Sequence, residues 1–177
     1  DHDSTPLETG SLTMTDRLSN MVFTEAYCRS LGFCGFESIE SLIGAGLGSV
    51  PQVGGVYVVL RQSHDEPEFL ATSPGGWFKG RDPSISLSAL LNNWVDGTEV
   101  IYIGKAQVLR KRVDQLLKYG MGKPVGHWGG RLMWQLRASG AFLLAWIQSE
   151  DPRTTEKGLL ADFETAYGRL PFANLRR

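Results

Sequence analysis

The chain has 177 residues, of which 42% are hydrophobic and 21% charged, with 18 lysines and arginines against 19 aspartates and glutamates. This composition is typical of one folded globular domain and excludes a disordered chain. The sequence has no run of about 18 apolar residues, which excludes a membrane-spanning helix, and two cysteines are too few for a disulfide scaffold. Residues 1–20 lack the features of a signal peptide, so a cytoplasmic protein with no membrane partner is expected.

Positive charge is concentrated in the middle of the chain. Residues 101–137 contain eight lysines and arginines and a single aspartate, whereas the whole chain has a formal charge of −1. A basic segment of this kind is typical of a surface that binds phosphate groups, although the same residues can also be the solvated faces of ordinary helices. The candidates for nucleic-acid contact are Lys105, Arg110, Lys111, Lys123 and Arg131.

The first part of the chain, residues 1–50, is expected to be a polar tail over 1–15 followed by a helical extension. Two short helices are predicted in the extension, near 23–31 and 36–44, because glycines interrupt the sequence between them. This pair of helices can cap the domain that follows or support a homodimer.

The remainder, residues 51–177, is expected to form a single domain. Apolar, β-branched runs predict three strands, over 55–61, 99–104 and 141–148. Amphipathic or capped segments predict helices over 84–94 and 109–120, from 127 onward, and from Thr154 or Thr155 to about 168. This order of elements indicates an α+β fold, in which helices flank a small sheet.

Two of the predicted strands carry a glycine and a tyrosine in opposite orders, as GVY at 55–57 and YIG at 102–104. An arginine ten residues after the YIG tyrosine, a glutamate in a later helix and a late asparagine complete an ordered set: Arg112, Glu156 and Asn174. The set resembles the GIY-YIG nuclease family over roughly residues 53–177. The segment YIGKAQVLRKRV is especially similar to the core of that family.

The resemblance implies a three-stranded antiparallel sheet flanked by helices, with the two motif tyrosines on adjacent strands. It also implies hydrolysis of a nucleic-acid phosphodiester, usually in DNA, with a divalent metal ion, Mg²⁺ or Mn²⁺. A stand-alone domain fits a restriction-type or repair-type endonuclease, and cutting of both strands would call for a homodimer. Two alternatives stay open, namely a protein of the same fold that binds nucleic acid without cleaving it, and an RNA-directed nuclease.

The chemistry of the charged members agrees with this hypothesis. Arg112 is always charged, and its forked guanidinium suits two phosphate oxygens. It borders the apolar stripe of its helix. The alternative is that Arg112 is an ordinary solvated cation on the helix surface. Glu156 shares the inward face of its helix with Leu159 and Leu160. It is the candidate metal ligand, and its alternative role is to stabilise the helix N-terminus.

The uncharged members have assigned roles as well. Tyr57 is the candidate base and Tyr102 orients the water or the phosphate, because nearby cations are expected to favour the phenolate. The alternative is that both are ordinary half-buried strand tyrosines. Asn174 is expected to orient a neighbour, since an amide does not titrate, unless it is simply a turn residue after Pro171.

One position departs from the family pattern. Members often carry His or Tyr one helical turn after the arginine, whereas this chain has Leu116 there. His127 can supply the missing polar group from the next segment, or it can be a structural histidine. The insertion over 61–99 is long for the family, and its WFKGR segment at 77–81 can stack on bases or cover the sheet edge.

Overall fold

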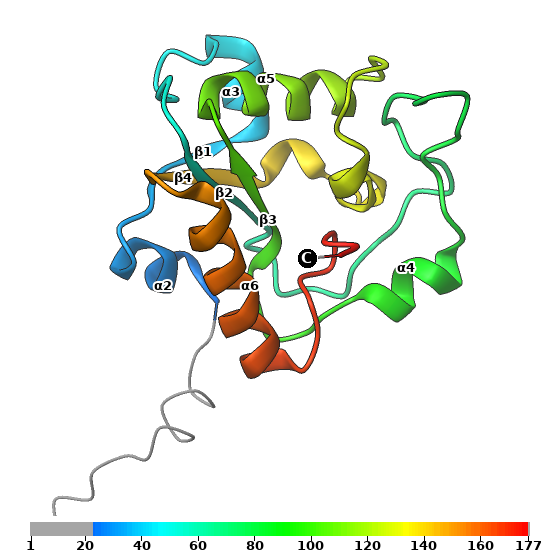
Figure 1. Ribbon diagram of the computed structural model, residues 1–177. Helices are drawn as coiled ribbons and strands as arrows, with labels where there is room; N and C mark the ends of the chain where they lie inside the picture. The colour runs from blue at the N-terminus through cyan, green and yellow to red at the C-terminus, as the bar shows by residue number, and fades with distance from the viewer. Residues whose placement is uncertain (1–22, 177) are drawn as a thin grey trace, which may run out of the picture.

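The computed structural model describes residues 23–176, which form a sheet with helices on both faces (Figure 1). The strands are β1 (Cys34–Ser38), β2 (Gly55–Leu60), β3 (Val100–Ala106) and β4 (Leu143–Gln148). The helices are α2 (Glu25–Ser30), α3 (Ile39–Ala45), α4 (Leu87–Asn93), α5 (Leu109–Gly120) and α6 (Pro152–Tyr167), with 3₁₀ helices η1 (Trp128–Gln135) and η2 (Ser139–Ala141). None of the helices described here has the length and apolar character needed to cross a bilayer. The polar tail expected over 1–15 lies outside the described residues.

The four strands lie in the order β1-β4-β2-β3, and every neighbouring pair is antiparallel. The predicted α+β class is confirmed, and each of the three strands predicted after residue 50 is present. Because β2 pairs directly with β3, the two motif tyrosines lie on adjacent strands. Strand β3 is at the end of the sheet, so one of its edges is free to accept the C-terminal segment.

The strand β1 corrects the sequence prediction, which placed a helix over 36–44 and only three strands in the sheet. Cys34–Ser38 pair with β4 through a bulge after Gly35, and helix α3 begins only at Ile39. The pairing depends on contacts that are distant in sequence, since a Cβ on Gly35, where φ is +94°, would lie 2.5 Å from the Trp146 ring. Strand pairing of this kind is set by tertiary context and leaves little local signal.

Helix starts also differ in part from the prediction. Helix α6 begins at Pro152 and is capped by Asp151, whose Oδ1 accepts a 3.1 Å hydrogen bond from the Thr154 amide, so neither Thr154 nor Thr155 is the cap. Proline suits the first helical position because its missing N–H would be unpaired there in any case. Ser86 caps α4, and its side chain accepts a hydrogen bond from the Ala89 amide. The helix predicted from residue 127 is the 3₁₀ helix η1.

The sheet buries both of its faces. On one face, Tyr57, Tyr102 and Trp146 pack with α3, α5 and η1. On the other face, Val58 and Ile103 pack with α2 and α6. Side chains alternate between the faces of a strand, so the two residue sets interleave along β2 and β3. The tyrosines and helix α6 therefore lie on opposite faces, and they can meet only around the free edge of β3.

The insertion between β2 and β3 is fixed to η1 by one buried amide. Gln135 Nε2 donates to the carbonyl oxygens of Leu70 and Ile85 at 3.0 and 2.9 Å, and its Oε1 accepts from the Ile85 amide at 3.0 Å. Arg137 N also donates to Glu68 O at 2.9 Å. These bonds hold the insertion against the η1 side of the domain, at the right of Figure 1.

Candidate active site

The two motif tyrosines lie on the same face of the sheet. Tyr57 pairs with Gly104 across the β2–β3 ladder, and Tyr102 is two residues earlier on β3, so it is the diagonal neighbour of Tyr57 on that face. Their ring centroids are 5.9 Å apart. Gly104 makes room for this contact, because a Cβ there would lie 2.5 Å from Tyr57 Cζ. The YIG glycine therefore allows the first tyrosine to lie over the second strand.

Replacing Gly104 with alanine is expected to destabilise the fold by about 1 to 3 kcal/mol, because the added methyl group overpacks a rigid aromatic cluster. Urea unfolding monitored by circular dichroism measures the change. Gly48→Ala is the matched control, since an added Cβ at Gly48 meets no atom within 4 Å. A Gly104→Ala protein as stable as the Gly48→Ala protein would contradict this account of the tyrosine packing.

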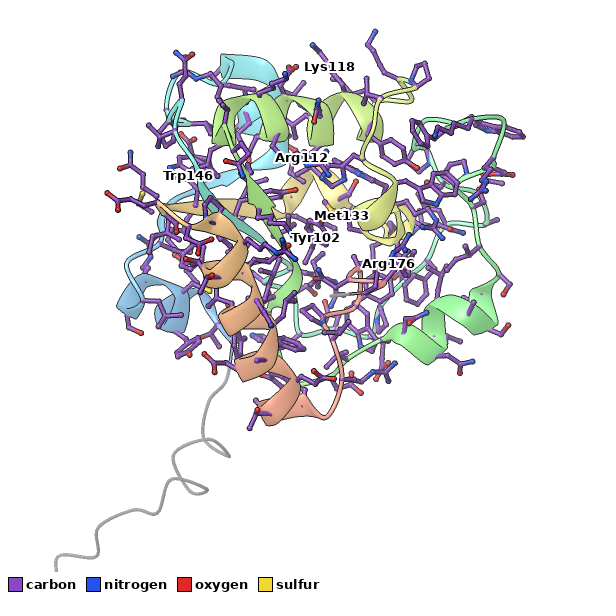
Figure 2. All side chains as sticks on the ribbon, viewed as in Figure 1. Tyr102, Arg112, Lys118, Met133, Trp146 and Arg176 are labelled. Atoms are coloured by element: carbon purple, nitrogen blue, oxygen red, sulfur yellow. The ribbon has the colours of Figure 1, made fainter. Side chains whose placement is uncertain are left out.

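Arg112 reaches the tyrosines from helix α5. Its Nη1 donates to Gly126 O at 2.7 Å and to Gln115 Oε1 at 3.1 Å. The guanidinium also interacts with both phenols, and its charge acts to lower the pKa of each. Figure 2 shows Arg112 above Tyr102 on the same side of the sheet. The arginine thus holds the loop after α5 and carries positive charge to the tyrosine pair.

His127 is the fourth member of the cluster. It is fully buried, and its Nε2 shares a 2.9 Å hydrogen bond with the Tyr57 hydroxyl. Its ring centroid is 5.7 Å from that of Tyr102. Burial, followed by the charge of Arg112, lowers the pKa of His127 to about 3. The structure therefore places a neutral imidazole against the tyrosine pair, while Leu116 is buried in the core.

The neutral state of His127 gives the fold a defined pH dependence. Its pKa lies below the unfolded value of 6.5, so the stabilisation is complete above about pH 6.5 and is lost as the pH falls toward the folded value of about 3. Between about pH 6.5 and pH 4.5 the free energy of unfolding is expected to fall by roughly 2 to 3 kcal/mol on this account alone.

Urea titrations at the two pH values measure this loss. His127→Gln should show a smaller loss than the wild type, because it removes the titrating group and keeps a hydrogen-bonding side chain. His64→Gln is the control, since the His64 side chain is exposed. If His127→Gln and the wild type lose the same stability, the buried imidazole does not set the pH dependence.

In the protein without substrate, the nearby cation Arg112 does not make either phenol ionise at neutral pH. Burial raises the pKa of Tyr57 well above its ordinary value, and the neighbouring Tyr102 adds to that rise. Burial also raises the pKa of Tyr102, against the opposing effects of Tyr57 and Arg112. Arg112 acts in the expected direction on both residues, but desolvation outweighs it. Both phenols are therefore protonated at neutral pH.

A pocket of about 420 Å³ lies at the free edge of β3, beside the tyrosines. Its lining includes Tyr102, Lys105, Arg131, Glu156 and Asn174. The Asn174 amide brackets one residue of β3, accepting from Ile103 N at 2.9 Å and donating to Ile103 O at 2.8 Å. Asn174 thus attaches the C-terminal segment to the strand edge and forms one wall of the pocket. Asn174 N also donates to Pro171 O at 2.9 Å, so the residue closes the turn after Pro171 as well.

Glu156 enters this pocket from the second turn of α6. Its side chain is 13% exposed, and its carboxylate forms an ion pair with Lys105, whose own side chain is 44% exposed. The described residues contain no group of three or more His, Cys, Asp or Glu side chains arranged to hold a metal ion. A single carboxylate in a polar pocket nevertheless fits Mg²⁺, which commonly takes one or two protein carboxylates and keeps several waters.

The basic residues predicted to contact nucleic acid divide into two groups. Lys105 and Arg131 line the pocket. Arg110 instead holds the loop before β2, with Nε donating to Val50 O at 2.7 Å and Nη2 to Gly48 O at 3.2 Å. Exposed Lys111 and Lys123 lie outside the pocket lining. The sequence does not distinguish these groups, because a cation's carbonyl partners are set by the tertiary fold.

The pocket also includes residues that the sequence analysis did not assign to it. Trp128 and Arg176 line it, and the Arg131 guanidinium lies 4.4 Å from the centre of the Trp128 ring. Trp128 follows His127 directly, so the segment that supplies the buried imidazole also supplies an aromatic wall. The sequence contained only a weak signal for Arg176, a pair of arginines at the end of the chain.

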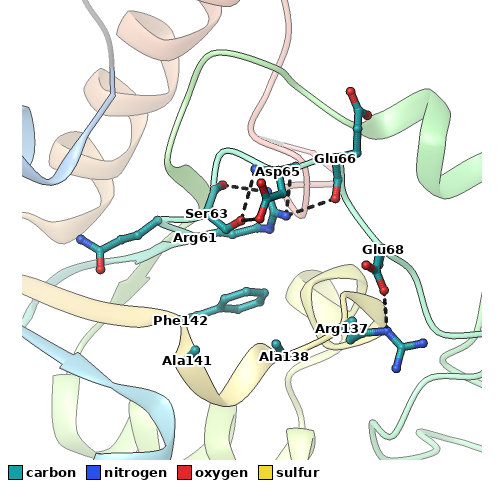
Figure 3. A pocket seen from close by; sticks show the side chains of 10 residues that line it. Arg61, Ser63, Asp65, Glu66, Glu68, Arg137, Ala138, Ala141 and Phe142 are labelled. Atoms are coloured by element: carbon teal, nitrogen blue, oxygen red, sulfur yellow. Dashed lines mark hydrogen bonds and ion pairs between the residues drawn. The ribbon is translucent and has the colours of Figure 1, made fainter.

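A different pocket, of about 320 Å³, lies near the opposite end of β2, between Arg61 and Phe142 (Figure 3). Its cations already have partners within the chain. Arg61 donates to the carbonyl oxygens of Ser63 and Asp65 at 2.9 Å, and Arg137 forms a 2.9 Å ion pair with Glu68. The tyrosines and Glu156 are not part of its lining, so we place the candidate active site at the β3 edge.

Comparison with known proteins adds no further identification. No family model, curated protein or solved structure matches the chain. The residues and geometry of the β3 edge are therefore what point to a function.

Proposed function

We propose that the chain is an endonuclease of the GIY-YIG type that hydrolyses phosphodiester bonds in DNA with Mg²⁺ or Mn²⁺. The observation that supports this proposal most is the convergence of four side chains from separate segments, Tyr57, Tyr102, Arg112 and His127. They meet beside a pocket that also contains the Glu156 carboxylate. A packing cluster would not need an arginine and a neutral histidine next to two phenols.

In this proposal Arg112 binds the phosphate that is cut. The guanidinium is always charged and donates in a planar fork, which matches two oxygens of a phosphodiester. Arg112 is not itself among the residues that line the β3-edge pocket, but it interacts with Tyr102, which is, so a phosphate that enters the pocket would meet the guanidinium beside the Tyr102 hydroxyl. Stabilising that charge lowers the barrier to hydrolysis.

The same geometry suggests a route for the proton of the attacking water. Tyr102 lines the pocket, whereas Tyr57 is fully buried behind it, with its hydroxyl bonded to neutral His127. Tyr102 would orient the water, and the proton would pass through the paired hydroxyls to His127 Nε2. The negative charge of a bound phosphate would oppose the effect of Arg112 and raise the pKa of His127. Tyr57 then relays the proton and does not need to exist as a free phenolate.

Glu156 is the residue that would hold the metal ion, with water filling the remaining positions. A bound Mg²⁺ or Mn²⁺ would supply charge neutralisation at the phosphate and its leaving oxygen. Lys105 must then turn away from Glu156, which its partly exposed side chain permits. The same ion pair also favours the alternative that the protein binds DNA without cleaving it, because an ammonium group already neutralises the carboxylate.

Incubation with supercoiled plasmid distinguishes these functions. The proposal expects nicked or linear DNA with Mg²⁺ or Mn²⁺, no product with EDTA, and slower cleavage of labelled RNA. A preparation that binds DNA but leaves it intact with every divalent ion would favour the non-cleaving alternative. Preferential cleavage of the RNA would favour an RNA-directed nuclease.

A further inference from the structure

The tip of the insertion presents an aromatic side chain to solvent. Phe78 and Arg81 exchange backbone hydrogen bonds of 3.2 and 3.0 Å, which closes a tight turn. Lys79 and Gly80 between them have φ values of +51° and +73°. Two positive φ values are typical of a type I′ turn, which joins its flanking residues closely. Trp77 precedes this turn and is 58% exposed, so it contributes little to the core.

The turn continues the wall of the β3-edge pocket. The Phe78 ring centroid is 6.4 Å from that of Trp128, which lines the pocket. The Arg131 guanidinium lies over the same Trp128 ring. Aromatic and cationic side chains therefore continue from the pocket to the turn that Trp77 precedes.

The same wall has three arginines around it, Arg81, Arg131 and Arg176. Burial lowers the pKa of Arg131, and the positive charges of Arg176 and Arg81 lower it further, against the opposing effect of Tyr119. Within residues 23–176, none of the three forms an ion pair with a carboxylate. Like charges held together without acidic partners repel one another, and bound phosphate groups would relieve that repulsion.

We propose that Arg81, Arg131, Arg176 and Trp77 form a subsite for single-stranded DNA next to the phosphodiester that is cut. This inference rests on the proposed function, because it assigns a strand that runs onward from the β3-edge pocket. The arginines contact its backbone phosphates, and Trp77 stacks on a base. In a duplex the base faces are already stacked, so an exposed indole favours an unpaired segment.

Fluorescence anisotropy in EDTA tests the subsite without requiring cleavage. The probes are a labelled thymidine oligonucleotide of about 12 nucleotides, a length that spans the usual single-strand site sizes, and a duplex of equal length. Wild-type protein should bind the single strand more tightly than the duplex. Trp77→Ala should weaken single-strand binding about tenfold, whereas Trp77→Phe should retain most of it, because one lost base–aromatic stack has an effect of this size.

Arg81→Gln should weaken binding and lower the slope of log affinity against log salt by about 0.7, as expected for one lost phosphate contact to a single strand. Leu91→Ala and Arg153→Gln are the matched controls, since they remove an exposed apolar and an exposed cationic side chain elsewhere. Urea midpoints confirm that each variant is folded.

Three results would overturn the subsite: unchanged binding by Trp77→Ala, an unchanged salt slope for Arg81→Gln, or tighter binding of the duplex. Failure of the nuclease proposal alone would give a different result. In that case single-strand binding keeps its dependence on Trp77, while the wild-type protein fails to cleave the plasmid with any divalent ion.

Discussion

Glu156→Gln is expected to lower the rate of Mg²⁺-dependent plasmid cleavage by about 10³-fold, at the upper end of the effect of removing one charge-stabilising group from an active site. The substitution keeps the size and hydrogen-bonding capacity of the side chain but removes the charge that would hold the metal ion. Single-turnover cleavage rates measured over a range of Mg²⁺ concentrations test this expectation. The residual activity of the variant should need more metal than the wild-type protein needs.

Controls separate a metal-binding role from a merely structural one. Asp162→Asn makes the same chemical change at an exposed position of α6 and should cleave at close to the wild-type rate. Lys105→Met removes the ion-pair partner of Glu156. If Glu156 acts only by pairing with Lys105, Glu156→Gln and Lys105→Met will impair cleavage equally. If Glu156 holds the metal, Lys105→Met will cleave at a lower Mg²⁺ concentration than Glu156→Gln requires.

A Glu156→Gln protein that cleaves like the wild type would remove the metal site from the proposal. The tyrosine cluster would then need another source of charge neutralisation. The described residues offer no second grouping of acidic, histidine or cysteine side chains for that purpose, so the result would count against metal-dependent cleavage at this edge.

The family resemblance implied that the two motif tyrosines lie on adjacent strands, and strand alternation and helix spacing explain why they share one face with the Arg112 helix. The GVY and YIG motifs lie in regular strands, so the register alone brings Tyr57 and Tyr102 to one face. Arg112 follows in a helix whose apolar stripe determines its rotation against the sheet. Within each element these relationships follow from local periodicity, whereas the meeting of Tyr57 and Tyr102 requires the pairing of β2 with β3.

Other parts of the site depend on contacts that the sequence pattern does not contain. His127 lies just before the 3₁₀ helix η1, and its position against Tyr57 depends on the loop that Arg112 holds through Gly126 O. Burial of the phenols, which reverses the expected shift of their pKa values, arises only when η1 covers the sheet. Strand β1 was missed for a similar reason, because its pairing with β4 requires the close approach of Gly35 and Trp146.

Arg110 has a structural role that the sequence does not reveal. It stands two residues before Arg112 on the same helix and belongs to the same basic segment, yet its guanidinium binds Val50 O and Gly48 O. A rotation of about 200° separates residues two apart on a helix, so the two arginines face different surroundings. This difference supplies a matched pair for testing which arginine contacts the phosphate.

Arg112→Lys is expected to slow cleavage about 100-fold, comparable to the loss of one oxyanion donor, although the positive charge is retained. Lysine cannot present the planar fork that binds two phosphate oxygens, and it cannot hold Gly126 O while doing so. Single-turnover rates at saturating DNA measure the effect on the chemical step, and anisotropy in EDTA measures DNA binding separately.

Arg110→Lys makes the same chemical change on a different face of helix α5. It should lower the urea midpoint, because it weakens the bonds to the 48–50 loop, but leave the cleavage rate within about threefold of wild type. Equal loss of cleavage in both variants would show that the arginines act through the fold. If Arg112→Lys is slow but its urea midpoint falls no further than that of Arg110→Lys, the result would instead place the guanidinium on the reacting phosphate, where the tyrosine cluster and the β3-edge pocket meet.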